Sequence, residues 1–157
     1  MTFALSDMWL TSGAFDELGE IPSKHSPEGD NLSPALCWGD APEGTKSYVV
    51  ICHDPDAPLV QNGAYGFVHW VLYNLPASTT ELAEGSDKGT RGVNDFGNQS
   101  YGGPMPPKKH GAHHYYFWVL ALDDERELLA GLSLNQLLGE IEPHLLGMNR
   151  LVGTYQR

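Results

Sequence analysis

Three runs of apolar residues, separated by stretches rich in glycine, proline and polar residues, predict buried β-strands. The run Tyr48–Cys52 is apolar without interruption, which is typical of a strand buried on both faces. The runs Phe67–Tyr73 and Tyr115–Leu122 are rich in aromatic and β-branched residues, which favour strands. A shorter apolar segment, Leu151–Tyr155, predicts a last strand at the end of the chain.

Side chains alternate between the two faces of a strand, so these runs also predict which residues face the same way. In the second run, one face would carry Phe67, His69, Val71 and Tyr73, and the other Val68, Trp70 and Leu72. In the third run and the two residues before it, one face would carry His113, Tyr115 and Phe117, and the other His114, Tyr116 and Trp118. Each strand therefore brings a histidine into an otherwise apolar setting.

One segment shows helical spacing. The apolar residues Leu134, Leu137, Leu138 and Ile141 recur at intervals of three and four, and Ser133 stands where an N-cap is needed. Pro143 should end or kink this helix. A shorter helix is expected over 123–129.

Composition favours a mainly β fold. The 157 residues include 18 glycines and 11 prolines, together 29, where average usage of roughly 12% gives about 19. This excess argues against a helical bundle and for short strands joined by turns. The segments 26–31 and 94–111 are expected to be loops, and a loop as long as the second is usually functional. With no repeat or linker, we expect a single domain over residues 1–157.

Charge excludes several classes of partner. Nine basic against 20 acidic residues give a net charge of −11, and the densest positive cluster is Lys108-Lys109-His110. Non-specific binding to nucleic acid and anchoring to anionic membranes both need a larger basic surface.

No apolar run approaches the roughly 20 residues that span a bilayer, and the start of the chain, 1–7, lacks a basic leader pattern. We expect a cytoplasmic protein whose two cysteines, Cys37 and Cys52, are reduced and act as small apolar residues.

Three polar clusters stand at the ends of apolar runs or within them. They are the proline-stiffened turn Asp54-Pro55-Asp56-Ala57-Pro58, the lone His69, and the long loop with the strand start His113–Phe117. If folding joins them, tyrosine hydroxyls, loop N–H groups and imidazoles would attract an anion locally. Carboxylates nearby would help the histidines stay protonated. The repulsive field of the whole chain would favour a small anion such as a phosphomonoester.

Other chemistries fit the residues less well. His110, His113 and His114 with Asp54 and Asp56 supply zinc-ligand types, but their spacing matches no strong zinc pattern. No nucleophile elbow, phosphate loop or dinucleotide fingerprint is present. Asp54 and Asp56 are too close in sequence to flank a sugar as a glycosidase pair does. The residues therefore point to no cofactor and to no nucleophile–base pair.

The ordered set of motifs resembles the phosphatidylethanolamine-binding protein family, in particular its bacterial Raf-kinase-inhibitor-like branch. The resemblance covers nearly the whole chain. It rests on Gly29-Asp30-Asn31-Leu32-Ser33-Pro34, Asp54-Pro55-Asp56-Ala57-Pro58, His69-Trp70, Tyr101-Gly102-Gly103-Pro104-Met105-Pro106-Pro107, Gly111-x-His113-x-Tyr115-x-Phe117 and Leu151-Val152-Gly153-Thr154-Tyr155.

The resemblance implies a large central antiparallel β-sheet packed on a smaller sheet, with a few peripheral α-helices, one of them near the C-terminus. It also implies a small anion-binding pocket, and it selects His113 rather than His114 for the pocket wall. By motif position the pocket residues would be Asp54, Asp56, His69, Met105, Pro106, Pro107, His113 and Tyr115. Two positions depart from the family pattern: Met105 stands where a smaller residue is common, and His114 where arginine is common.

These observations favour a non-enzymatic protein that binds a small anion, such as phosphate, a phosphomonoester or a phospholipid headgroup, with a regulatory role through contacts with other proteins. An alternative is an inhibitor of a kinase or protease that acts through protein contacts, with the pocket incidental. A third is an unrecognised hydrolase. The sequence leaves a homodimer open.

Overall fold

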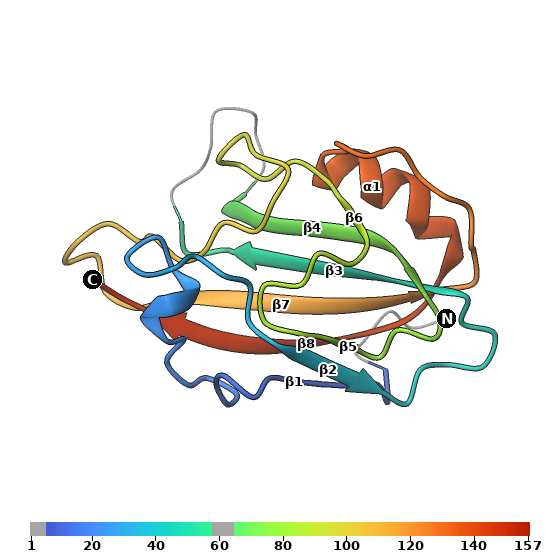
Figure 1. Ribbon diagram of the computed structural model, residues 1–157, viewed down its shortest axis with the longest axis horizontal. Helices are drawn as coiled ribbons and strands as arrows, with labels where there is room; N and C mark the ends of the chain where they lie inside the picture. Colours follow the sequence, from blue (N-terminus) through green and yellow to red (C-terminus); the bar gives the residue numbers. More distant parts are fainter. Residues whose placement is uncertain (1–5, 58–64) are drawn as a thin grey trace.

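The three apolar runs predicted as strands form the centre of a five-stranded antiparallel sheet. The computed structural model describes residues 6–57 and 65–157. The sheet has the order β6-β4-β3-β7-β8, and Figure 1 shows its long strands side by side. Its strands are β3 (Ser47–Asp54), β4 (Phe67–Pro76), β6 (Thr90–Arg91), β7 (His113–Leu122) and β8 (Leu145–Tyr155).

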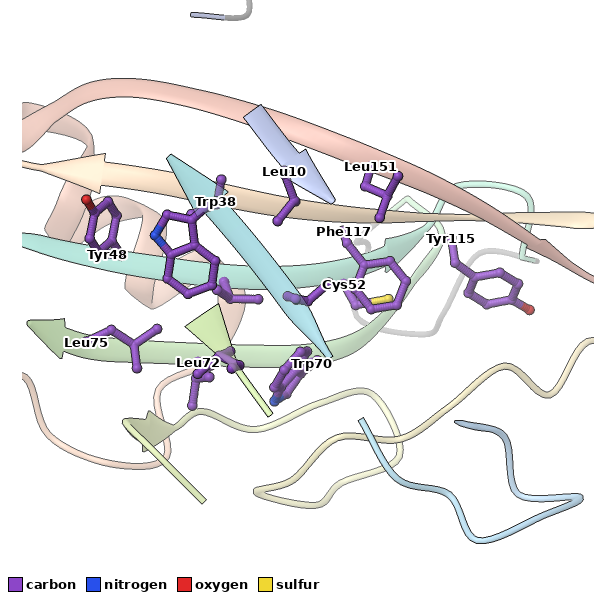
Figure 2. Packing of buried hydrophobic residues seen from close by; sticks show 14 of the residues in the cluster. Leu10, Trp38, Tyr48, Cys52, Trp70, Leu72, Leu75, Tyr115, Phe117 and Leu151 are labelled. Atoms are coloured by element: carbon purple, nitrogen blue, oxygen red, sulfur yellow. The ribbon is translucent and has the colours of Figure 1, made fainter. Parts of the chain in front are cut away.

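A smaller antiparallel sheet lies against one face of the large one. It has the order β1-β2-β5 and consists of β1 (Trp9–Thr11), β2 (Leu36–Gly39) and β5 (Glu81–Leu82). The main core fills the space between the sheets, where Trp38 of β2 meets Tyr48 of β3 edge to face at 5.5 Å between ring centroids. Figure 2 shows this packing, with Cys52 and Phe117 deep inside it. Cys52 is fully buried as predicted, and burial raises the pKa of its thiol, whereas Cys37 is half-buried.

The other face of the large sheet is partly covered by the predicted helix. This helix, α1 (Leu134–Ile141), begins at Ser133, whose side chain accepts a hydrogen bond from the Gln136 N–H while the Gln136 side chain accepts one from the Ser133 N–H. Leu137 and Ile141 lie in a second apolar cluster with Val49 and Tyr73. The predicted break at Pro143 falls within a short 3₁₀ turn, η2 (Glu142–His144), that follows α1 directly.

The predicted fold class is confirmed: two antiparallel sheets pack together, and an α-helix lies near the C-terminus. The described residues contain this one α-helix and two 3₁₀ turns, η2 and η1 (Ser23–His25). Segment 26–31 is a loop, and the described residues contain no strand or helix between β6 and β7. None of the helices in residues 6–57 and 65–157 has the length and apolar character needed to cross a bilayer.

Two details differ from the sequence prediction. Residues 123–129 form no helix but an irregular segment, which Asn74 binds: its side chain donates to the Leu128 carbonyl at 2.8 Å and accepts from the Leu128 N–H at 3.0 Å. The last strand is also longer than predicted. It begins at Leu145 because its first half pairs with β7, from Leu122 down to Val119.

The alternation predicted along β4 is wrong at its start. A β-bulge interrupts the pairing of β3 with β4, so that Cys52 pairs with Trp70 but His53 pairs with Val68. His69 is the extra residue. As a result Val68 packs with Val71 and Tyr73, while His69 lies beside Tyr115 on the face of the main core. On β7, by contrast, the predicted alternation is confirmed: Tyr115 and Phe117 are buried in the main core, and Trp118 packs on the other side.

Candidate functional site

A pocket of about 210 Å³ opens at the end of the large sheet where β3 ends and β4 and β7 begin. Antiparallel pairing places these three strand ends together, with Asp54 opposite Phe67 and His53 opposite Tyr116. The long loop between β6 and β7 closes one side. The pocket is lined by Asp54, Ala57, Phe67, His69, Phe96, Met105, Pro106, Pro107, His113 and Tyr115.

The long loop is fixed against the body of the protein by close backbone contacts. A Cβ added at Gly103 would lie 1.9 Å from the His25 carbonyl oxygen, so only glycine fits there. The Gly103 N–H donates to the Asn31 side chain at 2.8 Å, and the Arg157 Nε donates to the Pro106 carbonyl at 2.7 Å. Together with its prolines, these contacts hold the pocket wall in one conformation.

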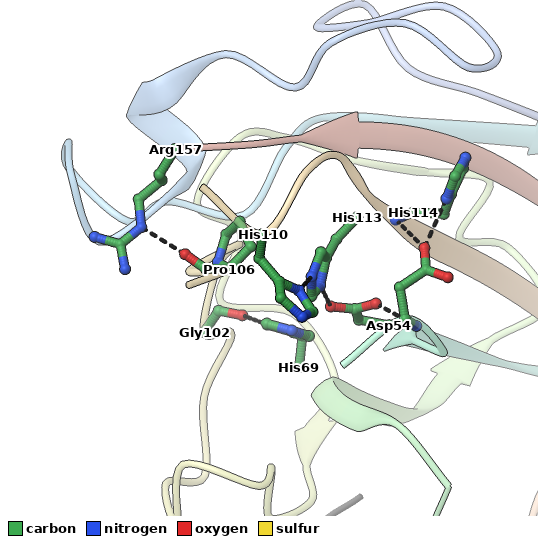
Figure 3. Close-up of polar contacts among 9 residues, drawn as sticks. Asp54, His69, Gly102, Pro106, His110, His113, His114 and Arg157 are labelled. Atoms are coloured by element: carbon green, nitrogen blue, oxygen red, sulfur yellow. Dashed lines mark hydrogen bonds and ion pairs between the residues drawn. The ribbon is translucent and has the colours of Figure 1, made fainter. Parts of the chain in front are cut away.

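A chain of three polar side chains runs from Asp54 and His113 in the pocket wall to the exposed His110 beside it (Figure 3). The Asp54 carboxylate accepts a hydrogen bond from Nδ1 of His113 at 2.7 Å, and both residues are 2% exposed. The Nε2 of His113 lies 2.7 Å from Nδ1 of His110. Because a carboxylate only accepts, the proton on His113 Nδ1 is fixed, and Asp54 orients the ring so that Nε2 points towards the pocket and His110.

His69 is a neutral histidine with a defined tautomer. Its Nδ1 donates to the Gly102 carbonyl at 2.7 Å, and its ring packs among Phe67, Phe96 and Tyr115. Burial lowers its pKa to about 4, against the weaker opposing effects of the Gly102 carbonyl and the Asp54 carboxylate. The expectation that nearby carboxylates keep this ring protonated is therefore wrong. In the neutral ring, Nε2 is an acceptor that a ligand O–H group can use.

The hydroxyl of Tyr115 is a buried donor with no partner. The residue is fully buried, and no hydrogen bond to its hydroxyl forms within the described residues. Burial and the nearby Asp54 carboxylate raise the pKa of Tyr115, so the hydroxyl keeps its proton. Since buried polar groups are almost always hydrogen-bonded, this donor marks a place where a bound group is needed to complete the site.

Asp56 lies outside the pocket. Its carboxylate accepts from both the backbone N–H of His114 at 2.8 Å and the His114 ring at 2.6 Å, on the exposed side of β7. Partial burial opposes ionisation, but the hydrogen bonds from His114 outweigh it and lower the pKa of Asp56. The residue nevertheless shapes the site, because its N–H donates to Asp54 at 2.8 Å and so fixes that carboxylate.

The structure thus brings seven of the eight predicted site residues to one pocket and leaves Asp56 beside it. Met105 lies at the rim and is 41% exposed, which agrees with a side chain that narrows the mouth.

Sequence reasoning missed Phe67, Phe96 and Ala57 as lining residues, and it considered His110 only as a metal ligand. Pro58, the end of the predicted turn, lies outside the described residues. Within the described part of the chain, no group of three or more potential ligands is arranged to hold a metal ion.

Comparison with known proteins gives a consistent result. A family model described as phosphatidylethanolamine-binding protein matches residues 11–156. The chain is 39% identical to the UPF0098 protein of Methanothermobacter thermautotrophicus, covering 96% of this chain and 99% of the relative. It is 40% identical to the UPF0098 protein of Aquifex aeolicus, over 96% and 89% of the two chains.

Two solved structures have the same fold. A phosphatidylethanolamine-binding protein homologue from Chlamydia trachomatis, CT736, superimposes with a TM-score of 0.88 at 38% identity, covering 96% of this chain and 97% of the other. Escherichia coli YbcL gives a TM-score of 0.88 at 30% identity, over 97% and 99%. The chain therefore belongs to the phosphatidylethanolamine-binding protein family, in the bacterial branch that includes YbcL.

Proposed function

We propose that this protein binds a small phosphate-bearing anion in the pocket between Asp54, His69, His113 and Tyr115, and that it does so without turning the ligand over. The observation that carries the proposal is the buried Tyr115 hydroxyl in the wall of this pocket, a donor that lies near the Asp54 carboxylate but has no well-aligned hydrogen bond within the described residues. Phosphate oxygens are strong acceptors, and a hydrogen bond from a buried hydroxyl to an anion is stronger than one between neutral groups.

The protonation states at the pocket favour a ligand that keeps one proton. His69 Nε2 is an acceptor at neutral pH because burial lowers the pKa of this ring to about 4. The Asp54 carboxyl group lies close by and accepts a hydrogen bond from His113. A phosphate monoanion fits this pattern, since its P–OH group can donate to His69 while its other oxygens accept from Tyr115. A phosphomonoester loses that proton with a pKa near 6, so affinity should fall as pH rises above about 6.

The size of the pocket limits the ligand. Its volume of about 210 Å³ lies below the range of roughly 300–1,000 Å³ typical of sites for drug-sized molecules. Phe67, Phe96 and the prolines 106 and 107 form apolar walls. This space suits the phosphate group itself, with any larger substituent leaving through the mouth beside Met105. The headgroup of phosphatidylethanolamine is a phosphodiester: its phosphate oxygens can accept from Tyr115 as those of a phosphomonoester do, but it has no P–OH group to donate to His69.

Titration with inorganic phosphate and glycerol phosphate, followed through the ring signals of His69 and His113 by NMR, tests the proposal. We expect both rings to shift with saturation at millimolar ligand, and Tyr115→Phe to weaken binding. Unmoved ring signals would refute the site. Comparison of glycerol phosphate with vesicles of phosphatidylethanolamine separates the two sources. Turnover of a phosphomonoester that is lost in His113→Ala would show an enzyme and overturn the non-enzymatic proposal.

A further inference from the structure

A second cavity, of about 280 Å³, lies apart from the Asp54–His113 pair and has a different chemical character. It is formed where the loop before β2, the loop after β5, strand β6 and the start of the long loop come together over Trp70 of β4. None of the residues that line it carries a carboxylate, although the chain as a whole has a net charge of −11. The polar side chains that line it are Asn31, Ser33, Ser86, Arg91, Ser100 and Tyr101.

Trp70 presents a nearly buried donor to this cavity. The residue is 2% exposed, and its ring packs edge to face against Tyr101 at 5.4 Å between centroids. In Figure 2 the indole nitrogen lies at the end of the ring that points away from the interior cluster, towards the loops. Within residues 6–57 and 65–157, this N–H donates to no protein group. An indole N–H can only donate, so an acceptor has to come from a ligand or from water.

The side chains of Asn31 and Ser86 offer donors because their acceptor atoms are already in use. Asn31 Oδ1 accepts from the Gly103 N–H at 2.8 Å, which leaves its NH₂ group. Ser86 Oγ accepts from the Lys88 N–H at 3.2 Å, which leaves its hydroxyl proton. Asn31 is thus oriented by the backbone of the long loop and Ser86 by that of its own loop, and each presents hydrogen to the cavity.

Arg91 supplies the positive charge. Its side chain is exposed at the end of β6, and the ion pairs found among the described residues leave it out. An arginine without a carboxylate partner, at the edge of a cavity lined by donors, is arranged to receive an anion. The guanidinium donates two parallel hydrogen bonds to a pair of oxygens, and a planar carboxylate presents such a pair.

We infer that this cavity binds the carboxylate group of a small organic acid, with Arg91 as the charged anchor and the Trp70 indole N–H as a second donor. The site is separate from the phosphate pocket proposed above, since the two share no lining residue. Its volume of about 280 Å³ is just below the range of drug-sized sites, which restricts the ligand to a few heavy atoms beyond the carboxylate.

The indole signals of the full-length ¹⁵N-labelled protein provide a direct test. The chain has four tryptophans, and Trp70→Phe identifies the signal of interest. Sodium acetate is titrated against sodium chloride at matched ionic strength. We expect the Trp70 N–H to shift with saturation in acetate alone, while the rings of His69 and His113 stay unchanged. Acetate affinity should fall by about tenfold or more in Arg91→Gln, equivalent to about 1.4 kcal/mol.

A matched variant separates a site from a general effect of charge. Arg126→Gln removes the same charge at a place where the side chain is bound to Asp124, and it should bind acetate like the wild type. Arg91→Lys keeps the charge but not the paired donors, so it should also bind acetate more weakly. No saturable shift, equal affinity in Arg91→Gln and the wild type, or tighter binding of inorganic phosphate than of acetate at Trp70 would overturn the inference.

Discussion

Replacing Tyr115 by phenylalanine should improve stability and weaken ligand binding at the same time. The hydroxyl is fully buried and has no hydrogen-bond partner within the described residues, and an unsatisfied buried polar group costs about 1–3 kcal/mol. We expect a gain at the lower end of this range, about 1 kcal/mol in the free energy of unfolding. In a chain of this length, that raises the Tm by about 2–4 °C.

The same substitution removes a donor to the bound anion. A hydrogen bond to a charged group is worth about 1.5–3 kcal/mol, so the Kd for phosphate should rise by at least about tenfold. Thermal unfolding without phosphate measures the first effect, and calorimetric titration with phosphate measures the second. Because both effects come from the same hydroxyl, Tyr115→Phe must show both a higher Tm without phosphate and a higher Kd for phosphate.

Tyr155→Phe is the matched control. The Tyr155 hydroxyl is hydrogen-bonded to both Ser26 and Glu28, and Tyr155 does not line the pocket. Its loss should therefore cost about 1 kcal/mol of stability and leave phosphate affinity unchanged. If Tyr115→Phe destabilises the protein as Tyr155→Phe does, or binds phosphate like the wild type, the hydroxyl is satisfied in solution and the reasoning fails.

Three further predictions concern titration and stability. The pKa of His69 is about 4 in the folded protein against 6.5 for an ordinary histidine. The unfolded chain therefore binds the extra proton first, and stability should fall by roughly 3 kcal/mol as pH drops from about 6.5 to 4; urea unfolding of His69→Gln should show that part of the pH dependence removed. Ser133→Ala should cost about 1 kcal/mol by chemical denaturation, because it removes the N-cap of α1, and an unchanged midpoint would contradict the cap. Asp54→Asn should destabilise the protein by about 1.5–3 kcal/mol, because it weakens the buried hydrogen bond that Asp54 accepts from His113. The exposed Asp56→Asn should cost no more than about 1 kcal/mol through its pair with His114; equal losses would refute the assigned burial.

The strands and the helix could be predicted because their patterns are local. Residues 48–52 and 115–122 are apolar enough to be buried whatever their partners, and Ser133 with its leucines marks a helix by itself. The failures came from distant contacts. Residues 123–129 are irregular, and Asn74, about 50 residues earlier, binds the backbone N–H and carbonyl of Leu128 there. The first half of β8 is a strand because β7 is long enough to pair with it.

The pocket could be predicted only in part for the same reason. Motif order brought His69, His113 and the Met105–Pro107 loop together, but the bulge that turns His69 towards Tyr115 depends on the pairing of β3 with β4. Phe96 lies in a loop with no periodicity, so nothing in its surroundings shows that it packs edge to face on His69 at 5.5 Å. The protonation of His69 was predicted wrongly. The sequence shows the nearby carboxylates, which raise the pKa of the ring, but it does not show how deeply the ring is buried, and burial has the larger effect on this pKa.

The two aspartate–histidine pairs of this protein show how burial gives different roles to the same chemistry. Asp54 pairs with His113 and Asp56 with His114, each with a carboxylate oxygen within 2.7 Å of a ring nitrogen. Because neighbouring residues on β7 point to opposite faces, one pair lies inside the pocket and the other in solvent. Inside, water cannot compete for the ring, and His113 is held in one tautomer and one orientation. Outside, water screens the pair, and the contribution of Asp56 to the site is its backbone N–H, which fixes Asp54.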